Sequence, residues 1–216
     1  MKDCELSRLM KMMEIENSLY DRGYEKIAGI DEAGRGPLCG SVVAACVILK
    51  KDTVIEGIND SKKLSEKKRE LLYDEIMNKA LAVGIGQADM SVIEDVNILN
   101  ATKTAMLDAL NNICIKPDYV LIDGNQKIDI DISNETVVSG DALSISIAAA
   151  SIIAKVTRDK MLYQADKLYP EYNFAKNKGY GTKAHIQAIA EYGLTPIHRE
   201  SFCKHFEKAK INKYMK

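Results

Sequence analysis

Two adjacent acids, Asp31 and Glu32, stand directly before a glycine-rich loop in the segment GIDEAGRGPLCG, residues 29–40. Two more acids occupy similar junctions, since Asp123 ends the apolar stretch VLID and Asp141 follows VSG. Carboxylate oxygens are hard ligands, which favour Mg²⁺ or Mn²⁺ over zinc. The four acids therefore predict a divalent-metal site that supports metal-assisted chemistry.

Each of these acids also has a simpler interpretation. An acid at the end of a strand is often a turn former, and Asp141 could cap the helix that follows it. Taken together, four acids at such junctions with few cations nearby favour the metal site. Because adjacent residues of a strand face opposite ways, Asp31 and Glu32 can share one site only if the strand ends or kinks there.

The glycine-rich loop matches neither common phosphate-binding motif. GRGPLCG has the spacing GxGxxxG and precedes another apolar strand, whereas a dinucleotide fingerprint has GxGxxG and precedes a helix. A P-loop would need Gly-Lys-Ser/Thr after the loop. The glycines around Arg35 would let backbone N–H groups approach a sugar-phosphate closely. A tight hairpin turn with an exposed arginine is the alternative.

The elements that must position these residues alternate between strands and helices, which predicts an α/β fold with a mixed sheet flanked by helices. Strands are expected at 26–31, 41–49, 81–89, 119–123 and 135–139. Helices are expected at 3–22, after the N-cap Ser65, at 98–114, after Gly140 and near 182–192. The first two strands should form an antiparallel hairpin, and those ending in Asp31 and Asp123 should be neighbours. At a strand spacing of about 4.8 Å, their carboxylates could then converge on one cation.

Composition excludes several classes of protein. The chain has 216 residues, 46% hydrophobic and 28% charged, which fits one continuous domain. That domain would comprise an N-terminal helix (1–24), an α/β core (about 25–165) and a basic helical extension (about 166–216). The five cysteines are scattered and the three histidines show no HxxxH or HxH spacing, so soft-metal chemistry is not expected. With no apolar run long enough for a bilayer and no targeting segment, we expect a cytoplasmic protein.

Charge is unevenly distributed, although its net value is only −1. Acids outnumber bases between Asp89 and Asp141, while bases outnumber acids from Lys176 to the C-terminus. This pattern suggests a metal-binding centre beside a surface that binds a polyanion. Solvated helix faces would produce the same pattern.

Five segments in order resemble the ribonuclease HII family: GIDEAGRGPLCGSVVAA, DSKKLSEKKRELLYDEI, VLIDG, SIAAASIIAKVTRD and YPEYNFAKNKGYGTKAH…GLTPIHRESF. The resemblance runs from about residue 25 to 206 and implies a ribonuclease H-like fold with a C-terminal helical extension. It also implies endonucleolytic cleavage of RNA in RNA/DNA hybrids and at single ribonucleotides in DNA. The segment before Gly29 is too short for the extra N-terminal domain of the sister type, ribonuclease HIII.

The resemblance implies a role for particular residues. Asp31, Glu32, Asp123 and Asp141 would hold two Mg²⁺ or Mn²⁺ ions, Gly34, Arg35 and Gly36 would sense the 2′-hydroxyl, and Tyr180 would stack on the neighbouring sugar. The expected phosphate contacts are Lys62, Lys63, Lys176, Lys178 and Lys183. Where the family usually has a lysine after Gly-Asp-Ala, this chain has Leu143, and Lys62 and Lys155 are the candidates to supply the missing cation. Asp159 is interpreted as an i, i+4 partner of Lys155.

Two other functions remain open from the sequence. A nucleic-acid-binding module could keep the fold without the reaction, although a pure binder gains nothing from four carboxylates facing a polyanion. A phosphotransfer or nucleotide-binding enzyme is disfavoured by the missing P-loop. The expected partner is an RNA/DNA hybrid or ribonucleotide-containing DNA, with no membrane and no obligate protein partner, and the protein is expected to be a monomer.

Overall fold

The computed structural model describes residues 2–206 and contains a mixed five-stranded sheet with strand order β3-β2-β1-β4-β5. Its strands are β1 (Ile27–Ala33), β2 (Val42–Leu49), β3 (Ala80–Ala88), β4 (Tyr119–Asp123) and β5 (Ser133–Val137). β2 is antiparallel to β1 and β3, whereas β4 is parallel to β1 and β5. The predicted α/β class, the first hairpin and the pairing of β1 with β4 are confirmed.

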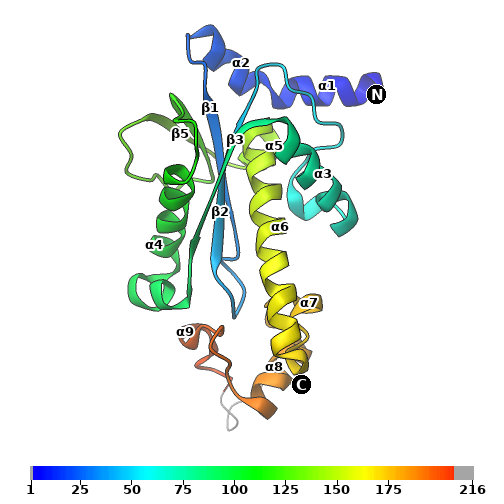
Figure 1. Cartoon of the computed structure of the whole chain (residues 1–216), viewed down its shortest axis with the longest axis vertical. Coiled ribbons are helices and arrows are strands. Elements are labelled where there is room, and N and C mark those ends of the chain that lie inside the picture. The colour runs from blue at the N-terminus through cyan, green and yellow to red at the C-terminus, as the bar shows by residue number, and fades with distance from the viewer. Residues whose placement is uncertain (1, 207–216) are drawn as a thin grey trace.

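Helices cover both faces of the sheet, with α4 on one face and α6 on the other (Figure 1). The longer helices are α1 (Asp3–Met12), α2 (Glu14–Asp21), α3 (Glu66–Lys79), α4 (Met90–Asn111), α6 (Ile145–Leu168) and α8 (Lys183–Tyr192). The short ones are η1 (Ser61–Lys63), α5 (Gly140–Leu143), η2 (Pro170–Tyr172), α7 (Phe174–Asn177) and α9 (Glu200–Cys203). The sheet is therefore the middle layer of three.

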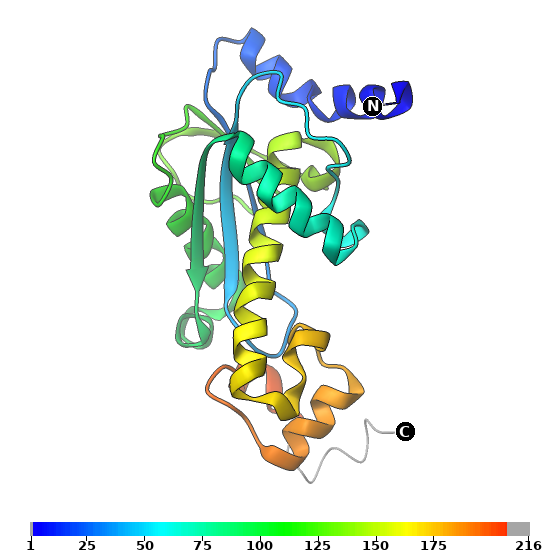
Figure 2. The ribbon, with the colours of Figure 1, turned by 45° about the vertical axis from the view of Figure 1, so that its right-hand side comes forward.

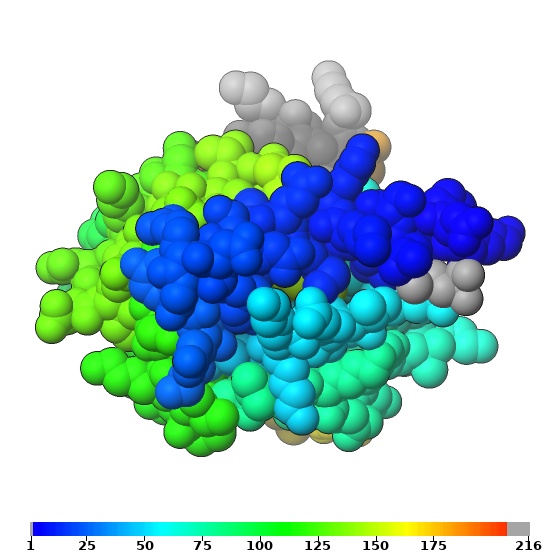
Figure 3. Space-filling model, turned by 90° about the horizontal axis from the view of Figure 1, so that it is seen from above, coloured from blue at the N-terminus to red at the C-terminus, as the bar shows by residue number. Residues whose placement is uncertain are grey.

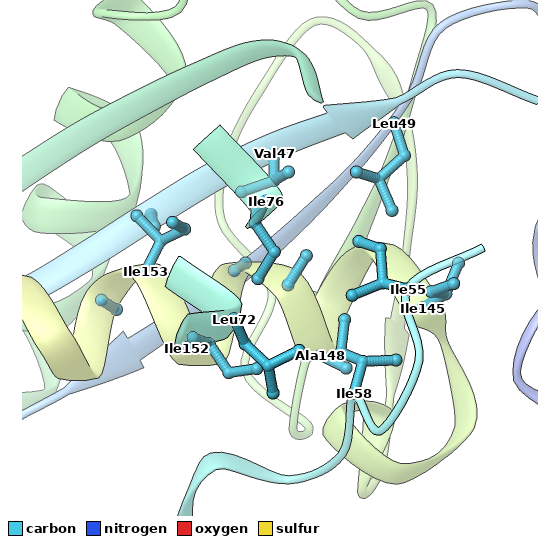
Figure 4. Close-up of a cluster of buried hydrophobic side chains, with 14 of the residues drawn as sticks. Val47, Leu49, Ile55, Ile58, Leu72, Ile76, Ile145, Ala148, Ile152 and Ile153 are labelled. Atoms are coloured by element: carbon cyan, nitrogen blue, oxygen red, sulfur yellow. The ribbon is translucent and has the colours of Figure 1, made fainter. Parts of the chain in front are cut away.

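Strand β2 is buried along its whole length because it is an interior strand of the sheet with helices over both faces. Its residues alternate between two hydrophobic cores. Ala45, Val47 and Leu49 pack with α6 and α3, as Figure 4 shows for Val47 and Leu49. Val42, Ala44, Cys46 and Ile48 pack with α4 on the opposite face. An unbroken apolar run in the sequence thus became a strand covered on both sides.

Several predicted boundaries are wrong. The N-terminal helix is two helices, α1 and α2, that meet at Met13. β1 continues through Asp31 and Glu32 to Ala33, so the strand does not end or kink at the paired acids. The helix predicted at 98–114 does start at residue 98, because the non-helical Asn97 (φ 66°) divides α4 into two helical segments, but it ends at Asn111 and the segment from Met90 was not predicted. The strand expected at 135–139 lies at Ser133–Val137.

The long helix predicted after Gly140 is also broken, because Ser144 adopts an extended conformation between α5 and α6. Ser144 instead caps α6, since its hydroxyl accepts a hydrogen bond from the Ile147 amide at 3.2 Å. Helix α6 crosses β1 in close contact at Gly29, where a Cβ atom would lie 2.2 Å from the Ser146 carbonyl carbon. This close crossing brings α5 and the start of α6 against β1 and β4.

The C-terminal helices gather at one end of the molecule, beside the loop that joins β1 to β2 (Figure 2). Leu38 and Cys39 of that loop share a hydrophobic cluster with Phe174 and Ile189. The predicted extension is therefore helical as far as it is described, and its part beyond Phe206 lies outside the described residues. Within residues 2–206, no helix is long and apolar enough to cross a membrane.

Candidate active site

Asp31 and Asp123 lie side by side on neighbouring parallel strands. The register pairs Ile30 with Ile122, one residue before each acid. Asp31 is 5% exposed and lies on the α6 face of the sheet, where the Ser151 hydroxyl is its hydrogen-bond partner. The sequence pattern therefore placed these two carboxylates correctly.

Glu32 reaches the same site although its side chain starts on the other face of the sheet. It pairs with Ala44 of β2, but β4 has already ended at Asp123, so no β4 residue is paired with Glu32. The missing neighbour leaves space for its side chain to approach Asp123. Burial and then the Asp123 charge raise the pKa of Glu32, while its ion pair with Arg35 opposes the rise. The acids share a site because β4 is short.

Asp141 completes the group from the helical side. It lies in α5, is 9% exposed, and its backbone N–H donates to Asp123 Oδ1 at 3.3 Å. A fifth carboxyl, Asp60, lies close enough to Asp141 for its charge to raise the pKa of Asp141 after burial, and sequence reasoning missed it. Asp60 caps η1 by accepting from the Lys62 amide at 2.9 Å, so the sequence offered only a capping signal at this position.

The carboxyl groups raise one another's pKa. Burial, followed by the charges of Glu32 and Asp123, raises the pKa of Asp31 well above its usual value. Burial is also the main cause at Glu32 and Asp141, and Asp123 adds to the rise in both. A site that concentrates negative charge in low dielectric fits hard divalent cations, which would offset the repulsion and find oxygen ligands there.

One lysine lies within the field of these acids. Partial burial disfavours the Lys62 ammonium, but Asp31, Asp141, Asp60 and Asp123 raise its pKa above the usual value. Leu143, where a lysine was expected, is 50% exposed. Lys155 is paired with Asp159 at 2.7 Å, which confirms the predicted i, i+4 contact. Lys62 is therefore better placed than Lys155 to act as the missing cation.

A fully buried arginine fixes the backbone of the glycine-rich loop. Arg199 is 0% exposed and its guanidinium donates to the carbonyls of Gly34, Arg35, Pro37 and Gly40 at 2.6–3.0 Å. In a trans peptide the N–H points away from the preceding C=O. The amides of Arg35 and Gly36 therefore point away from Arg199, on the far side of the loop.

A second buried arginine joins this loop to the segment that carries Tyr180. Arg158 is 2% exposed and donates to the carbonyls of Cys39, Ser41 and Lys178 at 3.0–3.1 Å. Neither Arg158 nor Arg199 forms an ion pair with an acid in residues 2–206. Burial, then the nearby Arg158 charge, lowers the pKa of Arg199 to about 10. Carbonyl dipoles thus replace water around both charges.

Tyr180 lies against the glycine-rich loop, with its ring Cε1 3.7 Å from the place that a Cβ on Gly36 would occupy. The tyrosine is 49% exposed, so it is a surface side chain and no core aromatic. A cavity of about 530 Å³ lies beside this loop, bordered by Glu32, Arg35, Lys62, Lys155, Tyr180 and Phe202. Of the predicted carboxylates, Glu32 borders this cavity together with the predicted ribose-sensing residues, and the charge of Asp123 acts on Glu32 from the rest of the acidic group.

A family model described as Ribonuclease HII matches residues 28–205. This chain belongs to the ribonuclease HII family. It is 58% identical over 202 residues to the ribonuclease HII of Acetivibrio thermocellus, covering 94% of this chain and 79% of that protein. The ribonuclease HII of Clostridioides difficile is 57% identical over 200 residues, covering 93% and 78%. The solved ribonuclease H2 of Pyrococcus horikoshii superposes with a TM-score of 0.72 at 25% identity, covering 86% of this chain and 99% of that one.

Members of the ribonuclease HII family are metal-dependent endoribonucleases with ribonuclease H activity on RNA/DNA hybrids. The predicted ribonuclease H-like fold is confirmed by the same comparisons.

The predicted phosphate-binding lysines are not equivalent in this ribonuclease HII. Lys62 borders the cavity, and Lys63, Lys176 and Lys183 are exposed. Lys178 is turned inward, with its Nζ 3.7 Å from the centroid of the Tyr163 ring and 3.7 Å from Glu66 Oε1. The structure thus does not bring Lys178 to the cavity, because Tyr163 and Glu66 engage its ammonium.

The ribonuclease HII fold also gathers Cys39, His185 and His198, whose ligand atoms lie within 4.8 Å of one another in the part of the chain described. No motif or spacing in the sequence predicts this cluster. Hydrogen bonds account for the imidazoles, since the Thr195 amide donates to His198 Nδ1, His198 Nε2 lies 3.0 Å from His185 Nε2, and His185 Nδ1 lies 2.9 Å from the Tyr180 carbonyl. Burial raises the pKa of the Cys39 thiol to about 12, which disfavours the thiolate that binds metals.

Proposed function

We propose that this protein cleaves the RNA strand of RNA/DNA hybrids and nicks DNA duplexes on the 5′ side of a single embedded ribonucleotide. The observation that carries the proposal is the convergence of Asp31, Glu32, Asp123 and Asp141 beside a glycine-rich loop that shares one cavity with Tyr180. Hydrolysis would leave a 5′-phosphate and a 3′-hydroxyl.

The four carboxylates would hold two divalent ions, Mg²⁺ or Mn²⁺. When bound, such ions activate a water and stabilise the leaving 3′-oxygen of an in-line displacement. The mutual repulsion of the acids supports this role, since burial and neighbouring carboxylates raise the pKa of Asp31, Glu32 and Asp141. Lys62, whose pKa the same acids raise, would place its charge near the scissile phosphate.

Ribose recognition would use the backbone of the loop. Arg199 turns the Gly34 and Arg35 carbonyls inward, so the following amides are available to a 2′-hydroxyl, the group that distinguishes RNA from DNA. Tyr180, beside Gly36 and half exposed, would pack on the neighbouring sugar. Lys63, Lys176 and Lys183 are accessible for phosphates, whose contacts position a duplex without reading its sequence.

The test uses a DNA duplex with one ribonucleotide and a matched all-DNA duplex. Purified protein with Mg²⁺ or Mn²⁺ should nick only the first duplex, and EDTA should abolish the nick. Asp123→Asn should lower kcat by at least about 10³-fold, the scale expected for loss of a major electrostatic stabiliser, while binding to the duplex survives.

The matched control is Asp129→Asn, which changes an exposed acid in the loop after β4. It should keep wild-type activity. Cleavage that persists in excess chelator would contradict the metal mechanism. Retention of more than about a tenth of wild-type activity by Asp123→Asn would contradict the assignment of that carboxylate.

A further inference from the structure

Glu16 is a buried carboxylate that lies outside the candidate active site. It is 4% exposed and belongs to α2, in the N-terminal segment that precedes the family match at residue 28. Its Oε1 accepts hydrogen bonds from Ser144 Oγ at 2.6 Å, Ser146 Oγ at 2.6 Å and the Ser146 amide at 3.0 Å. Within residues 2–206 it forms no ion pair, and its Oε2 has no hydrogen-bond partner.

A buried acid without a cation opposes folding unless its contacts compensate. All three bonds to Glu16 come from residues at the junction of α5 and α6. Ser144 is the extended residue between the two helices, and it donates to Glu16 while it accepts from the Ile147 amide. The carboxylate therefore fixes the point at which the chain leaves α5 and enters α6.

Helix α5 has four residues, and Asp141 is one of them. Its own backbone bonds are few: Ser144 N–H donates to the Gly140 carbonyl at 2.8 Å, and Ala142 N–H donates to the Ser139 carbonyl at 3.0 Å. So short a helix depends on its flanks for its position. The residue that follows α5 on the C-terminal side of Asp141 is Ser144, which is hydrogen-bonded to Glu16.

The N-terminal helices also pack on this junction. Leu9 and Met12 of α1 belong to the same hydrophobic core as Ile145 and Ala148 of α6. Seen from this end of the molecule, the two helices lie across its surface (Figure 3). The packing of α1 on α6 thus supports the hydrogen bonds that Glu16 accepts at the start of α6.

We propose that Glu16 is a positioning residue, which sets the place of Asp141 through Ser144 and Ser146 and thereby the affinity of the carboxylate site for divalent metal. The inference rests on the proposed metal-dependent nuclease function. It gives the N-terminal helix pair a part in catalysis although neither helix reaches the cavity. Glu16 itself touches no reacting atom.

The experiment compares Glu16→Ala and Glu16→Gln with Glu14→Ala, which removes an exposed acid from the same helix. Mn²⁺ binding is measured directly from the electron paramagnetic resonance signal of the free ion, and hybrid cleavage is measured against Mg²⁺ concentration. For Glu16→Ala we expect metal affinity to fall about 10-fold, the lower end for loss of an outer partner of a metal ligand. The KM for hybrid at saturating metal should not change. Glu16→Gln should fall between Glu16→Ala and wild type.

Thermal unfolding of each variant shows whether it is folded at the assay temperature. A folded Glu16→Ala protein with wild-type Mn²⁺ affinity would overturn the inference, because the residue would then serve stability alone. If Glu16→Ala does not fold, Ser146→Ala tests the same contact by deleting one hydrogen-bond donor. Wild-type Mn²⁺ affinity in both Ser146→Ala and Glu16→Gln would then overturn the inference. Absence of metal-dependent cleavage in the wild type and Glu14→Ala would instead contradict the proposed function.

Discussion

Arg199→Lys should damage the glycine-rich loop while it retains the positive charge. The buried arginine donates five hydrogen bonds to four carbonyls, and the bond to Pro37 is fully buried. A lysine ammonium has three N–H groups, so at least one of the four carbonyls loses its partner. A buried polar group without a partner costs about 1–3 kcal/mol. For a domain of this size, the melting temperature should fall by about 2–12 °C.

The same substitution should reduce ribose recognition more than duplex binding. If the Gly34 and Arg35 carbonyls are no longer held inward, the amides of Arg35 and Gly36 lose their orientation. A misplacement of about 1 Å can cost about 10²-fold in rate. We therefore expect kcat/KM on a single embedded ribonucleotide to fall by about that factor, whereas the Kd for an all-DNA duplex should stay unchanged because phosphate contacts lie elsewhere.

The assay measures Tm by calorimetry, and kcat/KM at a temperature where the variant is folded. Arg22→Lys, at an exposed position, is the matched control and should behave as wild type in both measurements. A Tm and kcat/KM equal to wild type in Arg199→Lys would refute the argument from hydrogen-bond counting. A lowered Tm with unchanged kcat/KM would show that Arg199 supports the fold and does not orient the loop.

Two further predictions concern the residues around the loop. Tyr180→Ala should lower kcat/KM about 5- to 150-fold on a single embedded ribonucleotide, which is the effect of losing one stacking contact, and should lower it less on an all-RNA strand. Equal losses on both substrates would argue against a sugar contact. The same loss in the exposed control Tyr192→Ala would argue against it as well. Burial and then the charge of His185 lower the pKa of His198 to about 4. As pH falls through about 6.5, His198 is therefore protonated in the unfolded chain but stays neutral in the folded protein. The contribution of His198 to the free energy of unfolding is complete above about pH 6.5, and it falls by about 2 kcal/mol by pH 5. The difference in unfolding free energy between wild type and His198→Gln should shrink by that amount between pH 7 and pH 5, and a constant difference would disprove the shift.

The sequence predicted the local elements well because their signals are local. Apolar runs of strand length became β2 and β4, and Ser65 caps α3 by accepting from the Lys68 amide at 3.3 Å. One prediction failed where a tertiary contact overrides the local pattern. Ser144 interrupts a segment of good helical composition because Glu16, far away in the sequence, bonds its hydroxyl.

The candidate site shows the same division. Asp31 and Asp123 could be paired from the sequence, since acids that follow two buried strands must meet if those strands are neighbours. That Glu32 joins them depends on β4 ending one residue beyond the pairing of Ile30 with Ile122, which no periodicity within β1 reveals. Asp60 was missed because its sequence signal is that of an ordinary helix cap.

Sequence patterns identify Asp31, Glu32, Asp123 and Asp141, the glycine-rich loop and Tyr180, and the strands that carry the first three acids. How these groups are held depends on residues that are distant in the sequence. Arg199 lies 165 residues from Gly34, and Glu16 lies 128 residues from Ser144. Buried polar groups must find partners wherever the fold supplies them, and that choice follows from the packing of the whole chain, which no short stretch of sequence encodes.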